Sequence, residues 1–429
     1  MGQPTTDARE MQAEGSTVRR RLGLEWPRFT SWQWKILAVL TFLNLFNYFD
    51  RQIIFPMFPL LRQEFHVSDF RLGLLGSVLI LVHSLAVLPL GFFSDRGPRQ
   101  KIMAGGVFFW SLATMLSGIV TSFRSLLTAR ALVGVGEAAY APAGTAIISD
   151  SFPEEFRARV QSVFNMGMLV GGVLGLAAGG VLAEWVGWRI AFFLVGFPGV
   201  ALAFASYRLR VPATALPKAS PPILPLLKNI PYVVVLAGGA LAVFAAASFV
   251  TWGTVFAVRY QGLTVAEAAT AMGALVLVGS IIGVLGGGYI ADRLQARWEW
   301  GRAFTVGATL LLGSPFLYWA VTTDSRLDFF LSIFLATALL TCYHGPTTAV
   351  IHDLTPKKAR ALAFALYLFA IHFLGDTMAP ALIGHISDLT DLRQGLLLGV
   401  RVNTLAGLCF LLAAVLIGFA AMRRARKPR

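Results

Sequence analysis

The chain has 429 residues, of which 56% are hydrophobic and 14% are charged, and its mean hydropathy is +0.68. A soluble domain typically carries about 25% charged residues, so this composition argues against a soluble protein and predicts a polytopic membrane protein surrounded by membrane lipids. The net charge is +14, but the basic residues alternate with the apolar runs, so we expect no nucleic-acid partner.

Residues 1–30 are polar and arginine-rich and lack an early apolar run, which predicts a cytoplasmic tail and no cleaved signal peptide. Twelve apolar runs follow, each long enough to cross about 30 Å of hydrocarbon as a helix that rises about 1.5 Å per residue. They lie at 34–61, 70–93, 101–121, 125–149, 158–183, 188–207, 231–258, 266–291, 302–322, 327–351, 358–386 and 396–422. The predicted fold class is therefore an all-α polytopic membrane protein with twelve transmembrane helices.

The loops between these runs predict the topology. Lys and Arg concentrate in loops on one side, so both termini are predicted to be cytoplasmic. Residues 208–230 are polar and proline-rich, which predicts a cytoplasmic linker. The expected domains are a six-helix bundle at 31–207, this linker, a six-helix bundle at 231–422 and a basic tail at 423–429. The expected location is a bacterial inner membrane.

The first run carries two adjacent charges, Asp50 and Arg51. A charge inside a bilayer costs roughly 3 kcal/mol or more, so an intramembrane ion usually faces a polar interior and has a function. Asn44, Asn47 and Arg51 follow helical spacing and form a polar stripe with Asp50 at its edge. We expect Asn47 and Tyr48 to line a substrate cavity beside this pair.

Three sequence patterns recur at corresponding helix ends in the two halves. Gly91-x-x-x-Asp95-Arg96 recurs 197 residues later from Gly288, Asp150-x-x-Pro153-x-x-x-Arg157 recurs 203 residues later from Asp353, and Gly180-x-x-x-Glu184 recurs 204 residues later from Gly384. Because an even number of spans separates the copies, they have the same orientation in the membrane. The pattern predicts a parallel repeat, with two bundles around a central cavity.

The fourth run adds Arg130 and Glu137, which are two helical turns apart on one face. Asp50 lies roughly 22 Å up its helix and Glu137 roughly 18 Å down an antiparallel one, so their depths nearly coincide. We therefore predict a cluster of Asp50, Arg51, Arg130 and Glu137 facing the cavity. An arginine that exchanges between carboxylates as they bind protons would couple protons to transport. The alternative is a salt-bridge network that only holds the helices together.

Glycines spaced by four residues mark the fifth and eighth runs and allow helices to approach closely. They are Gly167, Gly171, Gly175 and Gly179, followed by Gly279, Gly283 and Gly287. We expect them to form packing surfaces between the two halves.

The second half lacks an equivalent charge cluster, and we expect its cavity wall to offer hydrogen bonds without fixed charge. The residues predicted to line this wall are Thr251, Trp252, Thr341, His344, Thr348, His372 and Asp376. For His344 and His372 a structural role remains as plausible as a substrate contact, and His83 is interpreted as structural. The histidines and acidic residues are too scattered for a metal site, and no cofactor is predicted.

The segment from Gly91 through Asp95, Arg96 and Arg99 to Lys101 resembles the loop signature of the major facilitator superfamily, with Pro98 at the position of an expected glycine. Asn47-Tyr48-Phe49-Asp50-Arg51 and Gly136-Glu137-Ala138 resemble its Spinster group of lipid transporters, although organic-anion symporters share a similar pattern. The resemblance implies a monomer, a cytoplasmic gate at Gly91, Asp95, Arg96 and Arg99, and a coupling role for the charge cluster. A simpler interpretation makes the loop a topology anchor.

These observations favour a secondary transporter, not an enzyme, that moves an amphipathic lipid such as a lysophospholipid or sphingoid base by alternating access with proton coupling. The alternatives are a proton-coupled symporter of small organic anions, or a multidrug exporter. The partners expected are thus a lipid-like or small-molecule substrate, protons and membrane lipids. A small-anion site would require basic residues on both cavity walls, which tilts the prediction towards a lipid.

Overall fold

The computed structural model describes residues 29–211 and 223–425, and every regular element within these ranges is helical. The predicted tails and the middle of the predicted linker lie mostly outside them. In the first half the elements are α2 (Ser31–Ile53), η1 (Phe55–Met57), α3 (Phe58–Phe65), α4 (Asp69–Arg96), α5 (Arg99–Ser117), α6 (Phe123–Ser151), α7 (Glu154–Trp185) and α8 (Trp188–Tyr207). Side chains of Thr30, Ser68 and Ser122 cap the N-termini of α2, α4 and α6.

The second half contains two spans that are not continuous α-helices. Its elements are α9 (Leu224–Leu227), α10 (Ile230–Gln261), α11 (Val265–Gln295), α12 (Gly301–Thr322), α13 (Arg326–Leu340), η2 (Thr341–Tyr343), α14 (His344–Leu354), η3 (Lys357–Ala359), α15 (Arg360–Ala370), η4 (Ile371–Asp376), α16 (Ala379–Leu389) and α17 (Leu392–Ala425). The irregular turn η2 precedes Pro346, and the π-helical turn η4 precedes Pro380. Proline lacks the N–H that a regular helix would use, which favours such irregular turns.

Ten helical stretches among the described residues are long and apolar enough to cross a membrane. The predicted first and third spans, α2 and α5, are not among the ten, and both carry charged side chains. Each nevertheless packs inside the first half, α2 against α7 and α8, and α5 against α6 and α8. Together these elements make the chain an all-α polytopic membrane protein.

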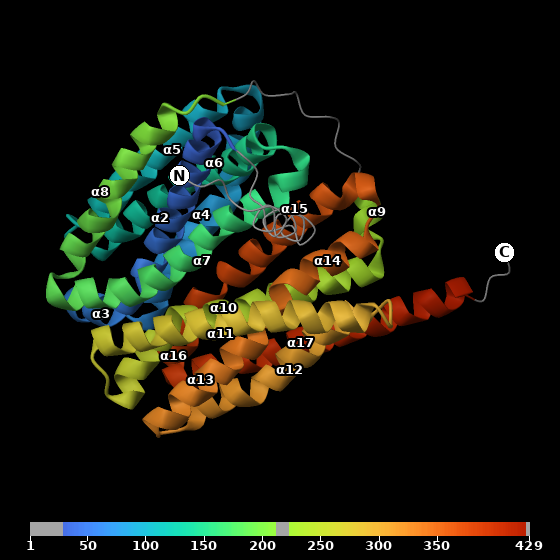
Figure 1. Cartoon of the computed structure of the whole chain (residues 1–429). Helices are drawn as coiled ribbons and strands as arrows, with labels where there is room; N and C mark the ends of the chain where they lie inside the picture. Colours follow the sequence, from blue (N-terminus) through green and yellow to red (C-terminus); the bar gives the residue numbers. More distant parts are fainter. Residues whose placement is uncertain (1–28, 212–222, 426–429) are drawn as a thin grey trace, which may run out of the picture.

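The two halves meet at one end and diverge at the other (Figure 1). We call the end with the turns at 66–68, 186–187, 262–264 and 390–391 the closed end, and the opposite end the open end. Across the halves, α7 packs on α11 and α4 packs on α16. One hydrophobic core joins Ile53 and Phe58 of the first half to Trp252 and Phe256 of the second, whereas a separate core around Leu40 belongs to the first half alone.

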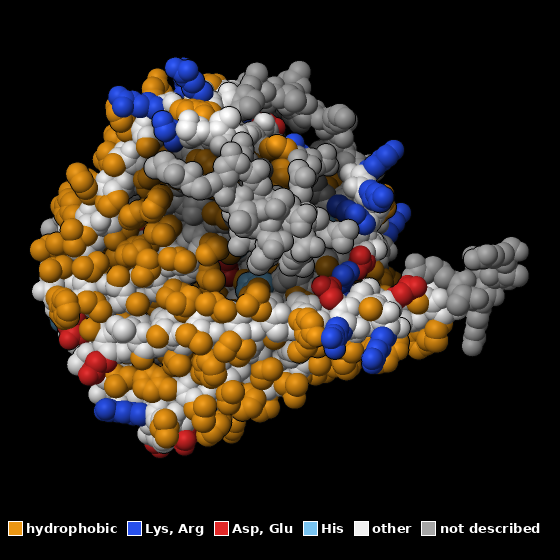
Figure 2. Space-filling model, in the orientation of Figure 1, with side chains coloured by type: hydrophobic (Ala, Val, Ile, Leu, Met, Phe, Trp, Pro, Cys, Tyr) orange, Lys and Arg blue, Asp and Glu red, His pale blue; other side chains and the backbone are white. Residues whose placement is uncertain are grey.

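The distribution of side chains over the surface is that of a membrane-spanning protein. Figure 2 shows hydrophobic side chains over most of the visible sides of both bundles, with Lys and Arg gathered at the open end of each. Basic residues concentrated at one end of the bundles are the pattern that the positive-inside rule describes for membrane proteins.

The expected role of the glycine stripes is wrong. A Cβ on Gly171 would lie 2.0 Å from the backbone oxygen of Leu45 in α2, and one on Gly283 would lie 2.2 Å from the oxygen of Ala338 in α13. Both contacts are within one half. The stripes therefore bring helices together inside each bundle, and the contact between halves uses other faces of α7 and α11.

Candidate functional site

The four charges predicted to cluster do meet, and they form two separate pairs. Arg130 Nη1 donates to Asp50 Oδ1 at 3.0 Å, and Arg51 Nε donates to Glu137 Oε2 at 2.6 Å. The two residues of each pair come from α2 and α6, so these stretches of the two helices lie side by side. The structure therefore contains two separate ion pairs with different surroundings, where a single four-residue cluster was expected.

The Asp50–Arg130 pair is sealed inside the first half. Both residues are fully buried, and Arg130 Nη2 also donates to the backbone oxygen of Asp50 at 3.1 Å. Thr114 of α5 donates its hydroxyl to the second carboxylate oxygen of Asp50. Every oxygen of this carboxylate thus has a donor, which is how a buried charge becomes tolerable.

The Arg51–Glu137 pair is the one that reaches open space. The Arg51 side chain is 10% exposed, whereas Glu137 is fully buried, and its second oxygen, Oε1, has no hydrogen-bond partner among the described residues. Arg51 Nη2 lies 3.3 Å from His83 Nδ1 of α4, and its guanidinium lies over the Tyr48 ring at 5.1 Å. Tyr48 therefore flanks the charge, and His83, which the sequence interpretation treated as structural, is a further member of this cluster.

On the opposite wall, two residues predicted to line it lie together, and the carboxylate of Asp376 differs from the expected wall without fixed charge. His372 Nδ1 lies 2.7 Å from Asp376 Oδ2 within the π-helical turn η4, and their side chains are 30% and 24% exposed. The turn η4 packs against α4 of the first half, so this second pair lies close to the contact between the halves. Residues four apart share a helix face, so the sequence spacing already places His372 and Asp376 together.

The remaining polar residues predicted in the second half divide into two groups. His344 is exposed, and its ring lies 4.2 Å from that of Tyr343. The hydroxyls of Thr341 and Thr348 are partly exposed, and each donates to a carbonyl one turn earlier in its own chain segment. These three positions remain candidates for substrate contact.

Three other predicted cavity residues are buried in this structure. Trp252 is fully buried, donates Nε1 to the carbonyl of Pro380 at 3.0 Å and packs its ring 5.3 Å from Phe58 of the other half. Its neighbour Thr251 is 1% exposed, and Asn47 is 2% exposed. We correct their assignment as cavity-lining residues: Trp252 seals the closed end, because the halves converge there.

The residues of the predicted gate lie at the junction of two helices: Gly91, Asp95 and Arg96 are in the last turns of α4, and Arg99 begins α5. A Cβ on Gly91 would reach only van der Waals contact with Pro142, and the side chains of Asp95 and Arg96 lie outside the described residues. Arg99 Nη1 donates to Asp150 Oδ2 at 2.5 Å. In the second half, Arg302 donates to Asp353 at 2.9 Å and to Asp292 at 2.8 Å. These ion pairs all remain within one half.

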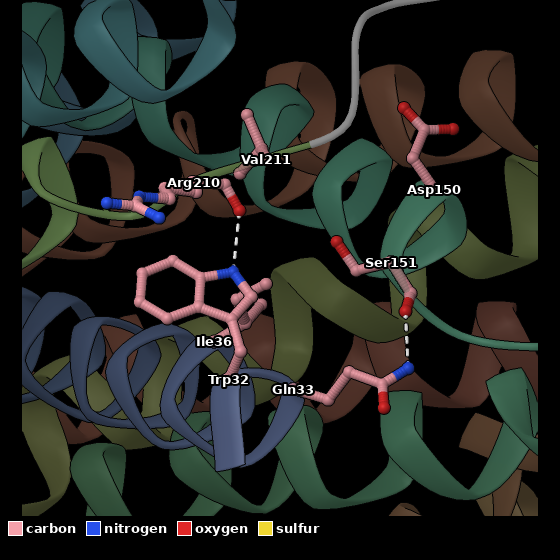
Figure 3. Close-up of a pocket in the computed structure, with 7 residues that line it drawn as sticks. All are labelled: Trp32, Gln33, Ile36, Asp150, Ser151, Arg210 and Val211. Carbon is pink, nitrogen blue, oxygen red and sulfur yellow. Dashed lines mark hydrogen bonds between the residues drawn. The ribbon is translucent and has the colours of Figure 1, made fainter. Parts of the chain in front are cut away.

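A cavity of about 540 Å³ lies at the open end of the first half, lined by Trp32, Gln33 and Arg210 among others (Figure 3). Trp32 Nε1 donates to the carbonyl of Arg210 at 2.7 Å, and Gln33 donates to the carbonyl of Ser151 at 2.9 Å. Asp50 is about 18 residues further along α2, or roughly 27 Å away. This cavity therefore seats the start of the linker and does not belong to the charge cluster.

Within the described ranges, no group of three or more His, Cys, Asp or Glu side chains could hold a metal ion. The candidate site consists of paired charged and polar side chains where the two bundles face each other.

Comparison with known proteins agrees with this geometry. The chain is 32% identical over 426 residues to human protein spinster homolog 1, spanning 89% of the chain and 80% of that protein. It is 29% identical over 398 residues to an MFS-type efflux pump of Mycolicibacterium smegmatis, spanning 89% of the chain and 92% of the pump.

Solved structures show the same fold. The crystal structure of a bacterial homologue of the human lysosomal transporter Spinster, inward-facing and unoccupied, superposes with a TM-score of 0.82 at 23% identity, covering 91% of this chain and 98% of that one. The nucleoside transporter NupG superposes with a TM-score of 0.71 at 12% identity, covering 89% of this chain and all of that one.

The sequence profile described as Major Facilitator Superfamily matches residues 40–380. With the Spinster relatives and the shared fold, this match shows that the chain belongs to the major facilitator superfamily, in its Spinster-like group, and is a multi-pass membrane transporter, not an enzyme.

Proposed function

We propose that this transporter moves an amphipathic lipid, of the lysophospholipid or sphingoid type, by alternating access, and that protons drive the movement. The observation that carries the proposal is the position of Arg51: its guanidinium pairs with the buried Glu137, and its side chain is 10% exposed. A cation that can change partner at such a position suits the binding of a charged headgroup.

Glu137 is the better proton acceptor of the two buried carboxylates. Asp50 is held by Arg130 and by Thr114, whereas Glu137 has one free oxygen and one ion pair. A proton on Glu137 would neutralise it, weaken its hold on Arg51 and release that guanidinium towards a substrate anion. Asp50 would then orient Arg130 and keep α2 and α6 together.

The cavity chemistry supports a headgroup with charges of both signs. Arg51 can hold a phosphate or carboxylate, because its guanidinium forms paired hydrogen bonds with such groups. Asp376 on the facing wall can hold an amine once it exchanges His372 for that ligand. Membership of the Spinster-like group supports a substrate that carries an apolar tail together with this headgroup.

Transport of labelled lysophosphatidylethanolamine into proteoliposomes with an imposed pH gradient tests the proposal. We expect uptake that depends on the gradient, that Arg51→Ala abolishes and that Arg124→Gln leaves unchanged, because Arg124 is exposed at the start of α6. Absence of transport by the parent protein, or full transport by Arg51→Ala, would refute it.

A second candidate function has its own support. The relative from Mycolicibacterium smegmatis is an MFS-type efflux pump, so export of drug-like cations is the alternative, and symport of small organic anions through Arg51 is another. Ethidium efflux and labelled carboxylate uptake in the same vesicles separate these three substrate classes.

Three further features belong to the proposal. The protein acts as a monomer, it resides in a bacterial inner membrane, and both termini are cytoplasmic. Concentration of Lys and Arg at the open end supports this orientation (Figure 2).

A further inference from the structure

The closed end is held by helix caps that cross from one half to the other. Asp388, at the end of α16, accepts hydrogen bonds from the backbone N–H groups of Asp69 and Phe70 in the first turn of α4, both at 2.8 Å. The first N–H groups of a helix have no partner within the helix, and a carboxylate there also interacts favourably with the helix dipole. The second half thus caps a helix of the first.

The reverse cap is present as well. Glu184, at the end of α7, accepts a hydrogen bond at 2.7 Å from the backbone N–H of Ala266 in the first turn of α11. Ala266 lies 197 residues after Asp69, the same offset that separates the Gly91 and Gly288 motifs. The two caps are therefore related by the internal repeat.

A glycine one helical turn before each carboxylate makes the contact possible. A Cβ on Gly384 would lie 2.4 Å from the backbone oxygen of Asp69, and one on Gly180 would lie 2.3 Å from the Cβ of Ala269. The repeated pattern Gly-x-x-x-Asp/Glu thus encodes both the close approach and the cap, since residues i and i+4 share a helix face.

One of the two caps is reinforced. The Asp69 carboxylate, 2% exposed, accepts two hydrogen bonds from Arg259 of α10 at 2.6 Å, one from Arg62 at 2.8 Å and one from Ser387 at 2.6 Å. Arg62 and Arg259 are also 197 residues apart. In the other copy the position of Asp69 is occupied by Ala266, so that cap has no such ion pairs.

We propose that these two reciprocal caps form the latch that keeps the closed end shut, and that the Asp69 side sets most of its strength. At the open end, the ion pairs between Arg99 and Asp150 and between Arg302 and its two aspartates each lie within a single half and do not cross between the halves. An interaction made in only one conformation shifts the equilibrium towards it. Transport therefore requires the latch to break once in each cycle, whatever the substrate.

The test measures the distance across the closed end by double electron–electron resonance. Spin labels are placed at Gln63→Cys and Leu389→Cys, both exposed and in opposite halves, in full-length protein with Cys342→Ala and Cys409→Ala, reconstituted in nanodiscs. For Asp69→Asn and Asp388→Ala we expect the ratio of long to short distances to rise roughly tenfold, because each variant removes charge-assisted hydrogen bonds. For Glu184→Gln we expect a smaller rise.

Asp324→Asn is the matched control. It breaks an ion pair of 2.9 Å with Arg393 at the same end of the molecule, but both residues belong to the second half. Unchanged distances in Asp69→Asn and Asp388→Ala would overturn the latch, as would an equal change in the control. If Asp69→Asn cannot be purified, the Asp388→Ala and Glu184→Gln variants test the latch instead. Both carboxylates are exposed, so removing either one leaves no buried charge without a partner.

Discussion

The buried Asp50–Arg130 pair predicts a large effect on stability. Arg130→Met keeps an apolar chain of similar length but leaves the Asp50 carboxylate buried with Thr114 as its remaining side-chain partner. Removing one partner of a buried ion pair costs about 3–5 kcal/mol, because the other charge remains without compensation. Arg130 is 0% exposed and Asp50 1% exposed, so solvent cannot relieve that charge.

The double variant Asp50→Leu/Arg130→Met separates charge from packing. With both charges removed it should be more stable than Arg130→Met by about 2 kcal/mol or more. Unfolding in detergent, followed by tryptophan fluorescence, measures both variants, with the exposed Arg124→Met as control. An Arg130→Met variant within about 1 kcal/mol of the parent, or a double variant no better than the single one, would refute a sealed ion pair.

Three further expectations concern single positions. His83→Phe removes the acceptor facing Arg51 and should raise the KM for labelled lysolipid several-fold, whereas His83→Gln should stay near the parent value; equal effects would contradict this contact. Gly171→Val should destabilise the first half by about 3 kcal/mol, measured by thermal unfolding, because its Cβ would overlap the α2 backbone. The hydrogen bond from Arg189 lowers the pKa of Glu64, so Glu64→Gln should be less stable than the parent at neutral pH, and this difference should vanish as the pH falls through the lowered pKa.

Much of the architecture follows from the sequence, because a bilayer requires apolar runs of a set length and basic loops on one side. The spacing of charges along the predicted helices also places Asp50, Arg51, Arg130 and Glu137 at one depth. Depth and periodicity do not fix how a helix is rotated against its neighbours, however. For that reason the pairing of the charges and the contribution of Thr114 could not be predicted.

Departures from regular α-helix could not be predicted from the sequence either. A π-helical turn at 371–376 interrupts the predicted eleventh span and holds His372 2.7 Å from Asp376, so a carboxylate lies on the wall that was expected to offer hydrogen bonds without fixed charge. The helix position of Trp252 predicts a cavity residue, but the convergence of the halves buries it against Phe58. Both outcomes depend on contacts between distant segments, which a single helix pattern does not contain.

The proton-linked switch at Arg51 and Glu137 is tested most directly by measuring lysophosphatidylethanolamine uptake into proteoliposomes across a series of external pH values. The parent protein should respond to an imposed pH gradient. Glu137→Gln, which mimics the protonated carboxylate, should still exchange labelled for unlabelled lipid but lose that response. Gradient-driven uptake by Glu137→Gln equal to that of the parent would contradict the switch.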